Sequence, residues 1–279
     1  MKTAIALGTF DGLHKGHRAV LSKTQGFYSV AVTFRVPPKV LKSPCLLMTP
    51  QDRKRALLEL GINEVSMFEF EDLCDLSPAQ FLDFLRLKYN PSRIVCGFNY
   101  RFGKEAKGDS GYILDYCKRH DIEFICVDSV SQNGNPISST AIRGLIASGD
   151  VEAANELLYK PFGFETEVVS GDRRGTKIGF PTINQVYPEL LATSKFGVYA
   201  SSVTVDGKRY KGITNIGVRP TFKTEQVGSE TYIKDFSSQI YGKSVRIELE
   251  RFIRAERKFS SIDELLDAIK KDVNTLFDE

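Results

Sequence analysis

Tryptophan is absent from this chain of 279 residues, and its five cysteines are too few and too scattered for a disulfide scaffold. No two of them form a C-x-x-C pair, the spacing typical of metal sites and redox centres. Several lie within apolar runs, as Cys126 does, so we expect buried free thiols in a reducing cytosol rather than a metal site.

Long apolar stretches are missing as well. A membrane-spanning helix needs a run of about 18 apolar residues, and the sequence has no such run. The apolar beginning of the chain reaches Asp11 too soon for a signal peptide. We therefore expect a cytoplasmic protein that has no membrane partner.

A strong charge of one sign is the third absence. The 38 lysines and arginines are balanced by 35 acidic residues, which leaves a net charge of +3. A nucleic-acid-binding domain carries a dense basic patch instead, so we expect no nucleic-acid partner. The hydrophobic fraction of 42% is ordinary for a soluble globular protein, and the length allows one large domain or two medium ones. The oligomeric state stays open, with a monomer as the default expectation.

The pattern of the chain changes near residue 158. Before it, short apolar runs alternate with helical segments, which is typical of a parallel α/β sheet. Helix signals include Thr49-Pro50 at a start and Gly61 at an end. The expected strands, interpreted as buried on both faces, span residues 4–7, 29–34, 64–68, 93–96 and 123–127.

After residue 158 the patterns are those of a small closed β-barrel with a helix at the end. Asp206-Gly207 is a strong hairpin signal between two apolar runs. Ser261 and Glu264 form a capping box ahead of a helical pattern. The barrel strands include residues 166–169, 198–205, 210–214 and 245–249. We predict two domains, residues 1–157 and 158–279.

The first candidate site is the string G-T-F-D-G-L-H-K-G-H over residues 8–17, directly after the first expected strand. Glycines let the backbone approach phosphate oxygens, and the start of a helix presents free N–H groups to the same anion. His14 and His17 are three residues apart, so both can donate N–H bonds to an α-phosphate as negative charge develops during attack.

Two further segments belong with this string. Residues 97–104 follow the fourth expected strand and should lie at the carboxyl edge of the sheet, where ligands bind in open α/β folds. Residues 137–143 place three hydroxyl side chains at a helix start with Arg143 one turn later, which can cradle an anion. Read alone, the hydroxyl run is also compatible with simple helix capping.

The second candidate site is the string G-D-R-R-G-T-K-I-G-F-P-T-I-N over residues 171–184. Thr182 and Asn184 can supply neutral oxygen ligands to a Mg²⁺ ion whose shell is completed by phosphates and water. Gly171 and Gly175, with Lys177, can form a flap over a triphosphate. Without further information, a loop with a rigid proline turn is an equal alternative.

These strings, in this order, resemble the prokaryotic bifunctional riboflavin kinase/FAD synthetase family over residues 5–273. H-x-G-H is the signature of the adenylyl- and cytidylyltransferases, and residues 179–184 are similar to the G-x-P-T-x-N motif of riboflavin kinases. The resemblance implies a Rossmann-like nucleotidyltransferase domain with a parallel sheet. A small antiparallel β-barrel kinase domain with a terminal helix follows. It also implies the activity: ATP phosphorylates riboflavin to FMN with Mg²⁺, and a second ATP converts FMN to FAD and pyrophosphate.

The resemblance assigns roles to residues. His14 and His17 catalyse adenylylation, and Glu230, on a strand, takes the proton from the ribityl hydroxyl. The first domain binds ATP through Gly8, Phe10, Gly16, Asn99, Ser138, Ser139, Thr140 and Arg143. The second binds ATP and flavin through Gly171, Gly175, Lys177, Thr182, Asn184 and Arg254, with Thr182 and Asn184 on the metal.

One segment departs from the family. A Phe-x-Pro-His-Pro string is common after the second strand, whereas residues 34–38 read F-R-V-P-P and lack the histidine. Arg35 is the residue that could compensate. This departure motivates an alternative, a riboflavin kinase with weak or lost adenylylation. A flavin-sensing regulatory protein is the alternative from another class, although a sensor needs neither the histidine pair nor Glu230.

Overall fold

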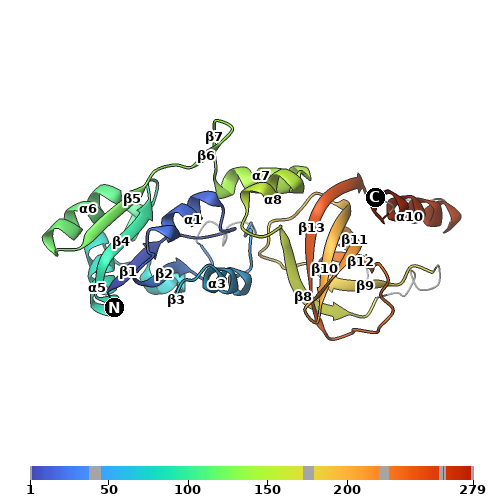
Figure 1. Cartoon of the computed structure of the whole chain (residues 1–279), viewed down its shortest axis with the longest axis horizontal. Coiled ribbons are helices and arrows are strands. Elements are labelled where there is room, and N and C mark those ends of the chain that lie inside the picture. Colours follow the sequence, from blue (N-terminus) through green and yellow to red (C-terminus); the bar gives the residue numbers. More distant parts are fainter. Residues whose placement is uncertain are drawn as a thin grey trace. The chain divides into compact units, whose positions relative to one another are not determined.

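A five-stranded parallel sheet organises the first half of the chain, with strand order β3-β2-β1-β4-β5 (Figure 1). The computed structural model describes residues 2–37, 45–171, 179–219, 226–257, 260 and 262–277. The elements of this half are β1 (Thr3–Leu7), α1 (Lys15–Ser22), β2 (Tyr28–Phe34), α3 (Pro50–Glu59), β3 (Glu64–Phe68), α4 (Phe70–Leu73), α5 (Pro78–Tyr89), β4 (Pro91–Gly97), α6 (Ser110–Arg119) and β5 (Glu123–Val127). A short hairpin, β6 (Ser131–Gln132) and β7 (Asn135–Pro136), precedes α7 (Ser139–Ser148) and α8 (Val151–Leu157).

Helices cover both faces of this sheet. Side chains that alternate along β1 and β2 divide between two apolar clusters, one with α5 and α6 and one with α1 and α3. Ile5 packs toward the first cluster, and its neighbour Ala6 packs toward the second. Because both faces are covered, the strands can be continuous apolar runs, which is the pattern of parallel sheets.

The helix signals of the sequence have the predicted effects. Thr49 caps α3 by accepting the backbone N–H of Asp52, Pro50 occupies the first turn, and Gly61 follows the last turn with a φ of +85°. Helix α5 begins with a capping box between Ser77 and Gln80. Capping depends on a few adjacent residues, so signals of this kind can be recognised in the sequence alone.

The two outer strands pack against the clusters on both faces, as expected, but their apolar side chains are only partly buried. β3 and β5 form the edges of the sheet, and β5 contains no buried residue. For the same reason the expected burial of Cys126 is wrong, because its side chain is exposed. Cys96 on the neighbouring strand is buried, and burial raises the pKa of its thiol to about 12. Cys74, Cys96, Cys117 and Cys126 are free thiols, as expected.

The second half contains a closed antiparallel barrel with strand order β10-β11-β12-β9-β8-β13. A positive φ at both Asp206 and Gly207 forms the predicted two-residue hairpin between β10 and β11. Figure 1 shows the barrel followed by the terminal helix α10 (Ile262–Phe277). The strands are β8 (Gly163–Val169), β9 (Thr182–Val186), β10 (Gly197–Val205), β11 (Lys208–Arg219), β12 (Gln226–Ile233) and β13 (Ser244–Ala255).

The start of α10 can be compared with the predicted capping box. Ser261 lies outside the described residues, while the carboxylate of Glu264 accepts hydrogen bonds from both the backbone N–H and the hydroxyl of Ser260. These hydrogen bonds lower the pKa of Glu264. Glu264 therefore stabilises the beginning of the helix, with Ser260 as the partner that the structure records.

The barrel interior is partly polar. Hydrogen bonds of 2.8 and 2.9 Å join the hydroxyls of Ser201, Thr214 and Thr231 in a row across three strands. The buried Gln185 amide donates to the carbonyls of Thr166 and Val245, so one side chain links β9 to β8 and β13. These hydrogen bonds satisfy polar groups that would otherwise be costly inside a barrel.

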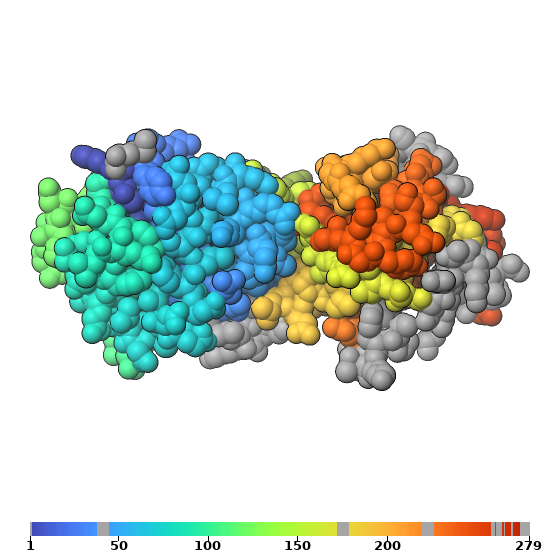
Figure 2. Space-filling view, turned by 90° about the horizontal axis from the view of Figure 1, so that it is seen from below, coloured from blue at the N-terminus to red at the C-terminus, as the bar shows by residue number. Residues whose placement is uncertain are grey.

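The chain divides into two compact units. The first comprises residues 1–142 and 157–159, and the second comprises residues 143–156 and 160–279, so α8 belongs with the barrel. Asn155 of α8 donates to the carbonyl of Leu249 and accepts the N–H of Phe162, both at 2.8 Å. Figure 2 shows one face of the surface of each unit, coloured along the chain from blue at the N-terminus to red at the C-terminus. Among the described residues no helix is both long and apolar enough to cross a membrane.

Candidate functional site

The turn that follows β1 has an unusual backbone. Phe10 and Leu13 adopt positive φ angles of 49° and 45°, which are uncommon for residues other than glycine. Glycines on either side make room for rings, because a Cβ on Gly8 would lie 3.0 Å from the Phe10 ring and one on Gly16 would lie 3.2 Å from His14. Backbone strain of this kind persists only where surrounding contacts hold it.

Segments that are distant in sequence provide those contacts. The buried carboxylate of Asp11 accepts the backbone N–H groups of Leu47 and Met48, at 2.8 and 3.2 Å. The hydroxyl of Ser139 donates to the carbonyl of Asp11 at 3.1 Å. The structure thus brings together residues 8–17 and the hydroxyl run at the start of α7, two segments that the sequence predicted to share a site.

His14 and His17 lie side by side at the start of α1. His14 is the N-cap residue, and its Nδ1 accepts the backbone N–H of His17 at 3.3 Å. The two rings stack with their centroids 3.7 Å apart, and the Phe10 ring meets the His17 ring edge to face with a centroid distance of 5.6 Å. His14 is buried, whereas His17 is half-buried and can reach a ligand. The pair therefore presents imidazole groups next to the N–H groups of a helix start.

The other predicted residues of this site have different surroundings. Asn99 is exposed just beyond the carboxyl end of β4, and Ser138 caps α7 by accepting the N–H of Ala141. Thr140 is exposed in the first turn of α7. Arg143, one turn later in α7, belongs to the second compact unit. Hydroxyl groups and a helix start thus gather near the turn, and both interpretations of the hydroxyl run, capping and anion binding, are compatible with this geometry.

Arg35, in the string that lacks the family histidine, has a partner of its own. Its Nε donates to the Glu69 carboxylate at 2.6 Å, and both side chains are half exposed. Pro38, at the end of the same string, lies outside the described residues. Glu69 thus engages the Nε of Arg35, and compensation by Arg35 for the missing imidazole stays a prediction.

The second site is built on the outer face of the barrel. Antiparallel pairing sets Asn184 of β9 directly opposite Glu230 of β12, and Thr182 opposite Tyr232. Directly opposed side chains lie on the same face of a sheet about 5 Å apart. Gln185 and Thr231, which follow Asn184 and Glu230 in sequence and point to the opposite face, are buried in the barrel, so the row faces outward and is half-buried.

The end of β8 borders this row. Gly171 lies so close to Asn184 that a Cβ on the glycine would overlap with the asparagine amide. Phe180 packs edge-on against Tyr232 with a centroid distance of 5.5 Å. Gly175 and Lys177 lie outside the described residues. The predicted residues Gly171, Thr182, Asn184 and Glu230 are therefore brought together.

Arg254, predicted to contact ATP or flavin, takes part in an ion pair. Its guanidinium donates to the Asp272 carboxylate of α10, with a shortest distance of 2.8 Å. Both side chains are largely buried, at 25% and 8% exposure. The pair joins the last barrel strand to the terminal helix, and a ligand contact by Arg254 stays a prediction.

Asn215 continues the row on the next strand. It pairs with Glu230 from the other side, on β11. Its Oδ1 atom is buried and has no hydrogen-bond partner within the described part of the chain. Strand register reveals this position, and register is not visible in the sequence.

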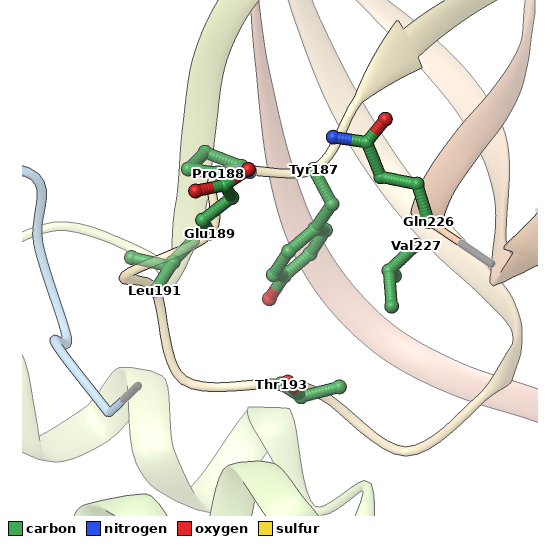
Figure 3. Close-up of a pocket in the computed structure, with 7 residues that line it drawn as sticks. All are labelled: Tyr187, Pro188, Glu189, Leu191, Thr193, Gln226 and Val227. Atoms are coloured by element: carbon green, nitrogen blue, oxygen red, sulfur yellow. The ribbon is translucent and has the colours of Figure 1, made fainter. Parts of the chain in front are cut away.

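A cavity of about 330 Å³ lies at the other end of β9 (Figure 3). Figure 3 shows the Tyr187 ring reaching into it, with Glu189 and Gln226 at the edge. The Tyr187 hydroxyl donates to the carbonyl of Ala192 at 2.7 Å. None of the predicted site residues lines this cavity.

Comparison with known proteins gives matches to both halves. A family model for FAD synthetase matches residues 1–141, and one for riboflavin kinase matches residues 158–278. The bifunctional riboflavin kinase/FMN adenylyltransferase of Bacillus subtilis is 35% identical, covering 97% of this chain and 90% of its own. The protein of the same name from Escherichia coli K12 is 31% identical, covering 96% of this chain and 90% of its own. A crystal structure titled macrolide-efflux protein, from Streptococcus pneumoniae, has a TM-score of 0.89 at 31% identity and covers 99% of this chain and 93% of that one.

Proposed function

We propose an assignment of residues to two reactions in this chain, which belongs to the family of bifunctional riboflavin kinase/FMN adenylyltransferases. The chain phosphorylates riboflavin to FMN with ATP and adenylylates FMN to FAD with release of pyrophosphate. Adenylylation takes place at the turn after β1, and phosphorylation takes place on the outer face of the barrel. The cytoplasmic location and the monomeric state stay predictions.

For adenylylation, the FMN phosphate is the nucleophile and the α-phosphate of ATP is attacked. The nucleophile is already ionised at neutral pH, so no side chain has to remove a proton from it. His14 and His17 stabilise the negative charge that builds on the α-phosphate, together with the N–H groups at the start of α1. The observation in support is the stacked histidine pair beside a turn held by contacts from two other segments.

For phosphorylation, a base is needed because an alcohol of high pKa must lose its proton. Glu230 is the carboxylate that lies opposite Asn184, and we assign the role of base to it. The single observation that carries this assignment is the register between β9 and β12, which sets Glu230 beside the two residues of the G-x-P-T-x-N motif. Tyr232 and Phe180 provide apolar surface next to it.

The site fits Mg²⁺ as the cofactor of the kinase reaction. Thr182 and Asn184 would hold the ion with neutral oxygens, and the described residues contain no cluster of three or more His, Cys, Asp or Glu side chains that would form an all-protein cage. Mg²⁺ at phosphoryl-transfer sites usually keeps water and substrate phosphates as most of its ligands. When bound, it supplies charge neutralisation for the transferred phosphate.

One assay tests the function as a whole. Purified protein is incubated with riboflavin, ATP and Mg²⁺, and FMN is separated from FAD. Formation of both supports the proposal. FMN alone indicates a kinase with lost adenylylation, the alternative suggested by the missing histidine, and neither product indicates a flavin sensor.

Replacing Gly171 by alanine should weaken ATP binding in the kinase reaction alone. The new methyl would displace the Asn184 amide, and overpacking of this kind costs about 1–3 kcal/mol. We expect the KM for Mg-ATP in phosphorylation to rise about tenfold, as every 1.4 kcal/mol corresponds to one decade. The control is Gly144→Ala in α7, where the added methyl would meet no atom within 4 Å. An unchanged KM would mean that Asn184 does not hold the ATP-bound metal.

Removing the first unit should leave an active kinase, provided that α8 is kept. A fragment of residues 139–279 retains Asn155, which bonds to both Leu249 and Phe162. A fragment of residues 157–279 loses it and leaves two backbone groups unpaired, at a cost of about 1–3 kcal/mol for each buried one. Thermal melting and riboflavin phosphorylation compare the two fragments. Equal melting temperatures would show that α8 does not stabilise the barrel.

A further inference from the structure

Arg53 of α3 is the largest of the fully buried side chains, with 0% exposure. A buried charge is costly unless its environment compensates for it. Burial lowers the pKa of the Arg53 guanidinium, and the nearby Asp11 carboxylate acts in the opposite direction. Arginine nonetheless stays protonated in proteins. The protein therefore keeps a cation in its interior, and the contacts of that cation indicate why.

The guanidinium of Arg53 donates to three backbone carbonyls. Its Nη1 bonds to Thr9 at 3.1 Å, and its Nη2 bonds to Phe34 at 2.6 Å and to Arg35 at 2.7 Å. Thr9 lies in the turn after β1, and the other two acceptors lie at the carboxyl end of β2. One side chain thus joins the ends of two neighbouring parallel strands.

The hydrogen bonds of Arg53 lie just beyond the paired part of β1 and β2. Within the sheet, β1 and β2 pair as far as Leu7 and Val32, and the N–H of Gly8 still donates to the carbonyl of Val32. The turn that follows β1 lies at the carboxyl edge of the sheet, where ligands of open α/β folds bind. Arg53 adds hydrogen bonds beyond the last paired residues, so it fixes this turn relative to the end of β2.

The Thr9 carbonyl is held especially firmly. It also accepts the hydroxyl of Thr33 at 3.0 Å, so both of its lone pairs are used. The next residue is Phe10, whose positive φ is strained, and the Phe10 ring meets His17 edge-on. When the carbonyl of Thr9 is held in place, the strained backbone of Phe10 is held as well. The Phe10 ring then sets the direction of the His17 imidazole, which it contacts.

We propose that Arg53 is a positioning residue for adenylylation: it holds the turn after β1 and the end of β2 in the geometry that directs His17 at the α-phosphate. The inference rests on the proposed assignment of adenylylation to this turn. It concerns a residue that touches neither ATP nor FMN in our assignment. Its loss should therefore lower kcat for FAD formation and not merely the affinity for a substrate.

The test uses the full chain with Arg53→Met, Arg53→Lys and the control Arg55→Met. Arg55 lies on the same helix with its side chain half exposed. A small misplacement of catalytic groups can cost about 10²-fold in rate, so we expect Arg53→Met to reduce kcat of FMN adenylylation by about that factor. Riboflavin phosphorylation in the same protein should be unchanged. Arg53→Lys keeps the charge and part of the hydrogen bonding, so it should recover part of the rate.

Several outcomes separate positioning from simple stabilisation. A residue that only stabilises the fold would lower the melting temperature and leave kcat per folded molecule unchanged well below the transition, and that result would overturn the inference. If Arg53→Met does not fold, Arg53→Lys decides: a wild-type kcat for FAD formation in that variant refutes the proposal. A wild-type protein that makes FMN but no FAD would refute the assigned activity itself, and the inference with it.

Discussion

Replacing Glu230 by glutamine should abolish riboflavin phosphorylation, with a loss of about 10²–10⁴-fold in kcat, because an amide cannot accept the proton of the ribityl hydroxyl. FMN adenylylation should continue at the wild-type rate. Glutamine has the same shape as glutamate, and Glu230 is only half-buried on the outer face of the barrel. The fold should therefore survive, and both rates are measured on one preparation.

The control for this variant is Glu167→Gln on β8. Glu167 is also a strand glutamate of the barrel, but it is exposed and outside the row formed by Asn184 and Glu230. It should keep both activities. Glu230→Asp keeps a carboxylate and retracts it by one methylene, so it should retain more kinase activity than the glutamine variant. If Glu230→Gln keeps more than about a third of the kinase rate, a loss far below that of a general base, the base lies elsewhere.

The sequence predicted those parts of the fold that depend on local chemistry. The Asp206-Gly207 turn and the Thr49 cap are properties of a few adjacent residues, and both were placed correctly. Two barrel strands run well past their predicted ends, β11 to Arg219 and β13 to Ala255, because pairing with neighbouring strands extends them beyond the apolar run. The partial exposure of β5 was missed because an edge strand and a central strand can have the same apolar run. Strand order in a sheet depends on the whole chain.

In the candidate sites, too, the features set by adjacent residues were predicted and those set by long-range pairing were not. The strings around His14 and Thr182 could be found in the sequence, since their residues are adjacent. The strand β9 was missed because its residues belong to a string with glycine and proline, which usually indicate a loop. Its pairing with β12, which brings Asn184 to Glu230, is a long-range property. Arg53 could not be recognised either, because an arginine among other charged residues of a helix is usually exposed.

Replacing His17 by alanine should have the effect opposite to that of Glu230→Gln. FAD formation should fall by about 10²–10³-fold, the usual cost of removing one donor that stabilises charge in the transition state. FMN formation should be unchanged. His17 is the better target of the pair because His14 also accepts the N–H that caps α1, so its loss would disturb the helix start as well. The measurement is the rate of FMN conversion to FAD at saturating ATP.

Two further variants decide how His17 acts. His17→Gln keeps a side-chain N–H donor, so it should retain more activity than the alanine variant if the role of His17 is to donate to the α-phosphate. His120→Ala removes the third histidine, which packs on Tyr116 at the end of α6, and should leave FAD formation unchanged. If the alanine and glutamine variants are equally impaired, the stacking of His17 on His14 matters more than its N–H group. If neither variant loses FAD formation, the turn after β1 is not the adenylylation site, because the imidazole beside the helix start would then contribute nothing to the transition state.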